Sequence, residues 1–273
     1  MYIRQRAGKS MKHIGKYIHL WTKLTVNSFL VSLTSRLSAI LFFIGKLLRF
    51  VFFGVFLIVL FSKTQGIADY TLMQGIFFFL TFNLIDTATQ LFFREVYRFR
   101  QLVVSGDFDL VLIKPMNPLF RALVGGADPL DLLMLIPYVW ALIFVGRRVG
   151  DITVTNATIY GLLLANGFII ATGFHILVLA LAIVTTEIDH AIMIYRDVTS
   201  MGRLPIDIYR EPLRSILTFV VPVGVMMTFP AKALFGFLSP GLIAMSLLVG
   251  GLFFLLSIRV WKYALTKYAS ASS

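Results

Sequence analysis

Ionisable side chains are rare in this sequence, and three of them lie inside stretches that are otherwise apolar. Lys46 and Arg49 interrupt the apolar run Leu37 to Phe61, and Asp86 interrupts the run Leu72 to Phe93. Residues three apart are neighbours on a helix surface, so the two cations share a face. An unpaired charge at the centre of a membrane helix costs about 2.5 to 3.5 kcal/mol. We therefore predict that Asp86 pairs with Lys46 or Arg49. The alternatives are that the cations extend to the headgroups, or that they contact an anionic substrate headgroup.

Uncharged polar residues also fall at membrane depth. Asn83, Asn166 and His175 each lie in a long apolar stretch. Polar side chains in membrane helices hydrogen-bond to neighbouring helices, and we predict that role for all three. Contact with a substrate path is the alternative.

A small group of ionisable residues follows the fourth apolar stretch. It consists of Glu187, Asp189 and His190, which are close enough in sequence to suggest a metal site. Their spacing matches no zinc or calcium loop, so we expect a solvated surface and no metal.

The sequence contains few residues that could carry out covalent catalysis or bind a nucleotide. The sequence has no cysteine, which removes thiolate catalysis, disulfides and cysteine metal sites. The tripeptide Gly8 to Ser10 reads GKS, but a phosphate loop requires a glycine five residues before Gly8, where Ile3 stands. We expect no catalytic residue and no cofactor in this chain.

The composition identifies the elements that must position these residues. Of 273 residues, 58% are hydrophobic and 14% are charged, against about 25% charged in an ordinary soluble domain. An all-α integral membrane protein with six transmembrane helices follows. A span needs about 20 apolar residues, and six stretches qualify: Leu37 to Phe61, Leu72 to Phe93, Leu130 to Val145, Ala157 to Thr185, Leu213 to Phe235 and Leu238 to Val260.

The distribution of positive charge predicts the orientation. The chain has 25 Lys and Arg against 13 Asp and Glu. In a soluble protein this excess would suggest nucleic acid, whereas here 19 of the 25 fall in segments that lie inside if the N-terminus is cytoplasmic. We expect both termini to be cytoplasmic, in the bacterial cytoplasmic (inner) membrane, with no nucleic-acid partner.

Residues 1–36 precede the first span and contain an amphipathic pattern. Ile14, Ile18, Trp21 and Leu24 repeat at helical spacing, and Lys12, Lys16, His19 and Lys23 lie on the opposite face. This pattern predicts a helix lying along the headgroup surface and contacting membrane lipids, with a solvated basic tail as the alternative.

Two long connections contrast with short ones on the other side of the predicted bundle. In the first, 94–131, Ser105 and Gly106 end a helix, and Asp107 is placed to cap a short helix that Pro115 stops. The second, 186–214, has mixed charges and a break from Gly202 to Pro205. Both could dock a soluble partner, or both could be ordinary connectors.

Three strings in these regions resemble a known family. SGDFDLVLIKPMNPLF (Ser105 to Phe120), GRLPIDIYREPLRSILTFVVPVGVMMTFPAKALFG (Gly202 to Gly236) and WKYALTKY (Trp261 to Tyr268) resemble segments of ABC-2 type transporter permeases, in a six-span branch once catalogued as a domain of unknown function. The resemblance covers 37–260 as the transmembrane domain, with 261–273 as a cytoplasmic tail. GGADP within 121–131 departs from the family's more charged wording.

The resemblance implies a permease subunit driven by separate ATPases. ATP and Mg would bind to a cytoplasmic ATPase dimer, which docks on coupling helices, and a second permease subunit, identical or different, would complete the pore. Transport would be export. The implied coupling residues are Ser105, Gly106, Asp107, Phe108, Asp109, Leu110, Lys114, Pro115, Glu187, Asp189, Arg196 and Asp197.

Two other functions remain open from the residues alone. A membrane enzyme acting on lipid-linked substrates would need Asp107 and Asp109, or the Glu187 to His190 group, as its acids. An ion-coupled secondary transporter would use Asp86 to carry coupling protons.

Overall fold

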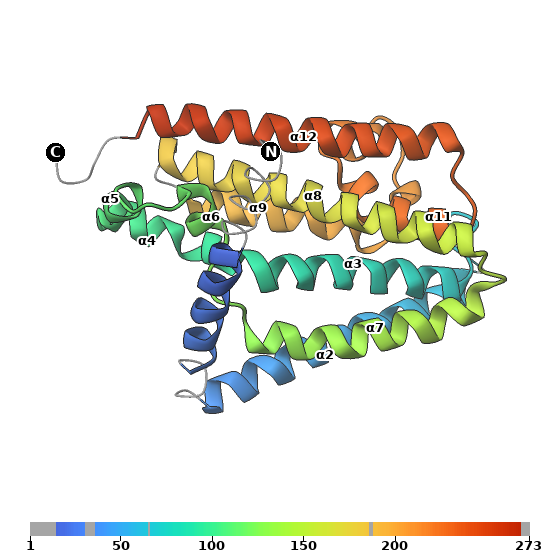
Figure 1. Ribbon diagram of the computed structural model, residues 1–273. Coiled ribbons are helices and arrows are strands. Elements are labelled where there is room, and N and C mark those ends of the chain that lie inside the picture. The colour runs from blue at the N-terminus through green and yellow to red at the C-terminus, as the bar shows by residue number, and fades with distance from the viewer. Residues whose placement is uncertain (1–14, 31–35, 65, 186–187, 269–273) are drawn as a thin grey trace, which may run out of the picture.

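The computed structural model describes residues 15–30, 36–64, 66–185 and 188–268, and these residues are predominantly helical (Figure 1). Five helices are long and apolar enough to cross a membrane. They are α2 (Arg36–Thr64), α3 (Leu72–Phe93), α7 (Pro129–Val149), α8 (Val154–Thr185) and α12 (Pro240–Thr266). Five of the six predicted spans are thereby confirmed, and an all-helical membrane protein is the observed class.

Shorter elements connect the long helices. Between α3 and α7 lie η1 (Arg94–Arg98), α4 (Phe99–Val104), α5 (Asp107–Leu112) and α6 (Pro118–Leu123). Between α8 and α12 lie α9 (Ile188–Ser200), η2 (Met201–Arg203), η3 (Ile206–Ile208), α10 (Leu213–Ser215), η4 (Ile216–Val220), η5 (Gly224–Thr228) and α11 (Phe229–Leu234). We call the end of the bundle that carries α5 the α5 end, and the opposite end, where α2 connects to α3, the Tyr70 end.

Local capping fixes where the long helices begin. The Thr71 side chain and the Gln74 side chain form a capping box at the start of α3. Asp128 caps α7 and Ser239 caps α12, and in both helices a proline occupies the next position. Proline is well tolerated there because the first-turn N–H groups have no intrahelical partner.

The predicted fifth span, Leu213 to Phe235, is wrong as a continuous crossing. It is two segments, Leu213–Val220 and Gly224–Leu234, bent by 77°. Arg214 in the first segment and Lys232 in the second both bind the carboxylate of Asp207. The pair therefore enters and leaves the bundle at one end, as a re-entrant hairpin, with two π-helical turns beside the bend.

Asp207 also shows which end this is. It accepts a hydrogen bond from Tyr70, which lies between α2 and α3. The 22 residues of α3 separate this connection from η1, or about 33 Å at 1.5 Å per residue. The chain leaves α8 at the α5 end and reaches the Tyr70 end by Asp207. The fifth crossing is therefore α9 with η2 and η3.

This crossing corrects the expected cytoplasmic loop 186–214. Most of that segment runs through the bundle: Ile192 and Tyr195 are buried with residues of α4 and α8. Arg203 lies within the crossing, and Arg214 lies at the Tyr70 end beside Asp207. Arg203 and Arg214 were counted among the basic residues predicted to lie on the cytoplasmic side. Without them, the excess of basic residues on that side is smaller than predicted.

Close backbone approach holds the re-entrant hairpin against the bundle. A Cβ added to Gly167 of α8 would lie 2.6 Å from the carbonyl oxygen of Met226. The hairpin from Val223 to Ala233 is buried almost without interruption. Irregular backbone at membrane depth is tolerated where protein surrounds it, and α8 provides that surrounding.

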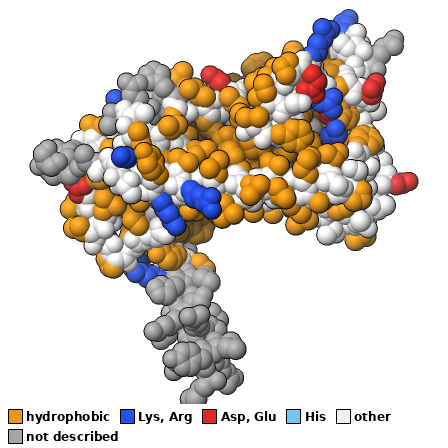
Figure 2. Space-filling view, turned by 90° about the horizontal axis from the view of Figure 1, so that it is seen from above, with side chains coloured by type: hydrophobic (Ala, Val, Ile, Leu, Met, Phe, Trp, Pro, Cys, Tyr) orange, Lys and Arg blue, Asp and Glu red, His pale blue; other side chains and the backbone are white. Residues whose placement is uncertain are grey.

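The surface distinguishes a central apolar zone from two polar ends. Figure 2 shows hydrophobic side chains across the middle of the face that carries α12, with charged side chains mostly toward the two ends. The helix at residues 15–30 lies at the α5 end and crosses the bundle steeply in Figure 1. It packs through Tyr17 on Phe120 and through Trp21 on Phe92. Residues 15–30 are thus helical, and the amphipathic, lipid-contacting role that we predicted for this segment stays a prediction.

Candidate functional site

Two cavities meet at Asp86 between α2, α3 and the fifth crossing. One measures about 90 Å³ and also reaches α7, and the other measures about 380 Å³ and is lined by α9. Both are lined by Arg49, Phe82, Asp86, Gln90 and Arg203. We call this pair of cavities the Asp86 cleft. It is the place where the described side chains combine charge, aromatic surface and open volume at membrane depth.

The predicted pairing of Asp86 with Lys46 is wrong. Lys46 binds the carboxylate of Asp131, a buried residue in the first turn of α7. Asp86 instead accepts a hydrogen bond of 2.8 Å from the side-chain amide of Gln90, one helical turn later. The role of Asp131 as the partner of Lys46 was not predicted, because Asp131 stands at the edge of an apolar run. An acidic residue in that position is expected to lie in water at the start of a helix.

Three arginines line the cleft, and none of them forms an ion pair with another described residue: Arg49, Arg196 and Arg203. Arg203 lies over the rings of Phe53 and Phe82, with its guanidinium carbon 5.8 and 5.7 Å from the ring centroids. Aromatic faces attract a cation over this range. Lys46 and these three arginines outnumber the carboxylates of Asp86, Asp131 and Asp197 that line the cleft, so one positive charge is left in excess.

The other polar residues predicted at membrane depth separate into different roles. Asn83 lines the cleft and donates a hydrogen bond to the Phe79 carbonyl oxygen. Asn166 donates to the Ser246 carbonyl oxygen at 2.9 Å, joining α8 to α12, which is the interhelical bond predicted for it. His175 is buried elsewhere, with Nδ1 donating to the Ala171 carbonyl oxygen of its own helix.

His175 belongs to an aromatic cluster and not to the cleft. Its ring packs on Phe93, Tyr97 and Tyr195, with the centroid of Tyr195 at 4.8 Å. This cluster joins α3, η1, α8 and α9. The hydrogen bond to another helix that we predicted for His175 is thus replaced by ring packing between helices.

Two predicted coupling residues lie in a different place from the others. Arg196 and Asp197 line the Asp86 cleft, so the structure does not bring them to the α5 surface. Glu187 and the side chains of Asp189 and His190 fall outside the described residues. One sequence pattern could have indicated that α9 packs inside the bundle. Ile192, Tyr195 and Thr199 repeat at helical spacing, and all three are buried.

The first predicted coupling segment forms as a short helix. Gly106 adopts a left-handed conformation, φ 78°, and occupies the N-cap position of α5. Asp107 is therefore the first helical residue and not the cap that we predicted; its carboxylate accepts a hydrogen bond from Ser105 Oγ at 2.7 Å. Glycine suits this position because it reaches positive φ without a Cβ penalty.

One face of α5 anchors it and the other is open. Phe108 is fully buried against Phe99 of α4, Trp261 of α12 and Tyr268, which follows the end of α12. Burial, with the neighbouring carboxylate of Asp109, raises the pKa of Tyr268 to about 12. The opposite face is exposed and carries Leu110, Ile113, Lys114 and Pro115.

The helix at residues 15–30 clasps the segment that follows α5. Lys16 Nζ donates to the carbonyl oxygen of Pro115 at 2.9 Å, and Tyr17 accepts from the backbone N–H of Asn117. Thr25 accepts from the backbone N–H of Ala127. The helix and the connection 94–131 thus form one joined structure at the α5 end.

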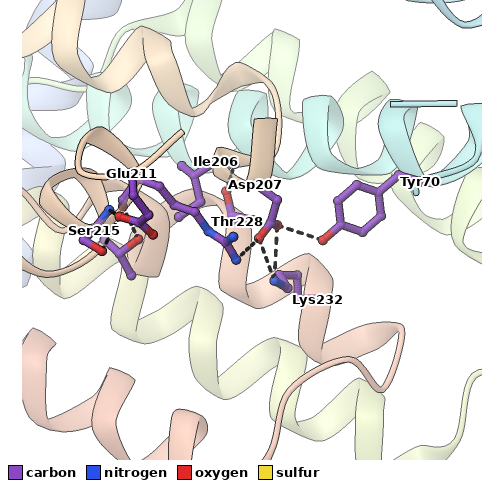
Figure 3. Close-up of polar contacts among 9 residues, drawn as sticks. Tyr70, Ile206, Asp207, Glu211, Ser215, Thr228 and Lys232 are labelled. Carbon is purple, nitrogen blue, oxygen red and sulfur yellow. Dashed lines mark hydrogen bonds and ion pairs between the residues drawn. The ribbon is translucent and has the colours of Figure 1, made fainter. Parts of the chain in front are cut away.

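A second polar cluster stands at the Tyr70 end (Figure 3). Asp207 accepts from Tyr70 at 2.8 Å, from Lys232 at 3.1 Å and from Arg214 at 2.8 Å. Burial and the Asp207 carboxylate raise the pKa of Tyr70, so it stays a neutral donor. Glu211 accepts from the hydroxyl of Ser215 nearby. The cluster ties the α2–α3 connection to both legs of the re-entrant hairpin.

The fold and these sites define a class of protein: a multi-pass membrane protein with a charged cleft at membrane depth and an anchored short helix exposed at one end. Residues 47–272 match the family described as ABC-2 family transporter protein, and the chain belongs to that family. Its members are membrane transport components that work with a cytoplasmic ATPase subunit. No curated protein and no solved structure matches the chain significantly.

Proposed function

We propose that the chain is the transmembrane permease subunit of an ATP-driven exporter, with ATP and Mg bound by a cytoplasmic ATPase dimer. The observation that carries the proposal is the position of α5. It is a short helix fixed to the bundle by its buried face and open to solvent on the other face. A lever needs both properties, because it must receive a partner and transmit the partner's movement.

The exposed face of α5 is suited to a protein partner. Leu110 is 53% exposed and Ile113 is 79% exposed. Apolar side chains held at the tip of a structure, with charged neighbours such as Lys114, are typical of a docking surface. We propose that the α5 end is the cytoplasmic end, with both chain termini in the cytoplasm of a bacterial cell.

Movement of α5 has a direct route into the bundle. Phe108 contacts Phe99 on α4, which continues from α3, and Trp261 on α12. A displacement of the helix would therefore shift two crossings at once. Rigid packing transmits such displacements because cores resist compression.

The Asp86 cleft is the proposed translocation path. It lies along α2, α3 and α9, and its wall toward α2 is open, since Arg49 and Arg196 are exposed. A second permease subunit, identical or different, would complete the pore. Export follows from the short connections at the Tyr70 end, which offer little surface for capturing a substrate.

The test is copurification with the ATPase from the native host. Leu110→Glu and Ile113→Glu place charge on the exposed face of α5 without touching its anchor. We expect each to reduce the amount of ATPase that copurifies by about tenfold, as a lost apolar anchor does. Val154→Glu is the matched control, since Val154 is 85% exposed at the Tyr70 end.

Two results would refute the proposal. One is the absence of any ATPase from the wild-type preparation. The other is equal ATPase recovery from the Ile113→Glu and Val154→Glu proteins, provided that both elute as folded protein in size-exclusion chromatography.

A further inference from the structure

The Asp86 cleft adjoins a series of two further cavities that extends to the α5 end. A cavity of about 590 Å³ lies against α2 and is lined by Lys46, Arg49 and Arg196, so it borders the cleft at Arg49. It shares Ser38 and Phe42 with another cavity of about 400 Å³. Shared lining residues make these cavities neighbours, and together they follow one side of α2.

This series of cavities carries cations at successive depths. Arg94, Arg98 and Arg121 line the outermost cavity, beside residues of the helix at 15–30. Lys46 and then Arg49 follow along α2; from Ser38 to Arg49 the distance is about 16 Å at 1.5 Å per residue. Arg203 stands in the cleft itself. Positive side chains thus continue from the bundle end into its interior.

Part of this charge is already balanced and part is not. Arg94 and Lys46 bind Asp128 and Asp131, and Arg121 binds Glu95 at 2.7 Å. Arg49, Arg196 and Arg203 form no ion pair with another described residue, and the carboxylates of Asp86 and Asp197 in the same cleft are one fewer than these three cations. Cations at membrane depth are costly when unpaired, so the arrangement favours an anion as the occupant.

Apolar side chains line the part of the series that lies against α2. Leu41 and Phe42 line the cavity against α2 and are 60% and 68% exposed. Phe50 and Phe53 line the cleft. A free inorganic anion would make no favourable contact with these apolar side chains. An acyl or prenyl chain would pack on them while its headgroup contacts the arginines.

We propose that the cavities along α2 form a lateral track for an amphiphile with an oxyanion headgroup, such as a phosphate, entering from the leaflet at the α5 end. The headgroup moves along Arg98, Arg49 and Arg203 while its tail stays against α2. Arginine suits this role because its planar fork binds phosphate oxygens in pairs. The proposal rests on the transport function above and adds the chemical class of the substrate.

The test uses the purified complex in nanodiscs of phosphatidylcholine with a fluorescent phosphatidate as probe. We expect saturable binding, and about tenfold weaker binding in Arg49→Gln and in Arg196→Gln, the usual effect of losing one charge-assisted hydrogen bond. Arg49→Lys should bind more tightly than Arg49→Gln and more weakly than wild type, because the charge is kept and the paired hydrogen bonds are lost. Arg259→Gln, an exposed position on α12 remote from the track, should bind as wild type does.

Three further arms separate the possible sources of the binding. Fluorescent diacylglycerol lacks the anion and should bind weakly; equal affinity would overturn the proposal. Inorganic phosphate should fail to displace the probe, and complete displacement would show a site for the free anion instead. Binding unchanged in both glutamine variants would also overturn it. ATPase copurification, measured on the same samples, reports separately on the transport function.

Discussion

The hydroxyl of Tyr70 donates a hydrogen bond to Oδ2 of Asp207, although the two residues are 137 positions apart in sequence. This contact brings the chain that follows α9 to the end of the bundle where α2 meets α3. The expected cytoplasmic connection 186–214 thereby becomes a crossing, and the hairpin after it becomes re-entrant.

Cysteine labelling tests this topology, because the chain has no cysteine of its own. We predict that Glu211→Cys reacts with a membrane-impermeant maleimide from the same side as Asp151→Cys, and from the side opposite to Lys114→Cys. All three positions are exposed. Labelling of Glu211→Cys together with Lys114→Cys would instead support the topology expected from hydropathy.

Asp207→Asn should destabilise the protein by about 2 kcal/mol, because Lys232 is then left partly buried without its carboxylate. Tyr70→Phe removes one hydrogen bond to that carboxylate and should cost about 1 kcal/mol. Thermal unfolding in detergent measures both. The order of the two variants is the decisive outcome, since a larger effect of Tyr70→Phe would mean that the Tyr70 hydroxyl stabilises the cluster more than the charge of Asp207 does.

Lys46 and Asp131 should behave as a coupled pair. Asp131→Lys alone is predicted to reduce the yield of folded protein, since a buried unpaired charge costs about 3 to 5 kcal/mol. Combining it with Lys46→Asp should restore part of that loss, with Arg94, 3.6 Å from Asp131, limiting the recovery. The swap of Lys46 with Asp86 serves as the comparison and should give no recovery.

Gly167→Val should loosen the re-entrant hairpin. The added side chain meets the Met226 carbonyl oxygen, which is backbone and cannot rotate away. We expect a loss of about 1 to 3 kcal/mol, the usual cost of overpacking, and faster proteolysis of the hairpin. Gly161→Val on the same helix is the matched control, because a Cβ there has no atom within 4 Å; equal effects of the two would refute the contact.

His175→Phe should leave transport unchanged. The ring lies among Phe93, Tyr97 and Tyr195, and its Nε2 is buried without a hydrogen-bond partner. Phenylalanine keeps the ring contacts and removes an unsatisfied polar atom, which offsets the lost bond to Ala171. A loss of transport with unchanged thermal stability would return His175 to the substrate path.

Five spans could be predicted from apolar length alone, and α3 begins and ends at the predicted residues. The fifth crossing could not, because α9 presents an apolar face to α8 and a charged face to the cleft. A hydropathy window averages the two faces, so Arg196 and Asp197 hide the burial of Ile192 and Tyr195. The re-entrant hairpin was predicted as a span because its sequence from Leu213 is apolar enough to cross a membrane. Its bend cannot be seen in a hydropathy profile.

The candidate site was recovered in part. Lys46, Arg49 and Asp86 were noticed because charge inside an apolar run is visible in sequence, and all three line the cleft. Their pairing was not predictable, since Asp131 reaches Lys46 from α7, 85 residues away. Packing decides which helices are neighbours, and the spacing of residues in the sequence does not indicate it.

The attachment of α2 differs along its length. Its C-terminal half is packed into α3 through Leu57 and Phe61, which are buried beside Phe79. Its N-terminal half stands away from the bundle over the cavities, with the Lys46–Asp131 ion pair as a tie across them. The helix α2 is therefore fixed to the bundle at its C-terminal half and is tied across the cavities by an ion pair at its N-terminal half. If these cavities carry the proposed substrate, bending of the N-terminal half would change their width while the contacts of Leu57 and Phe61 stay in place.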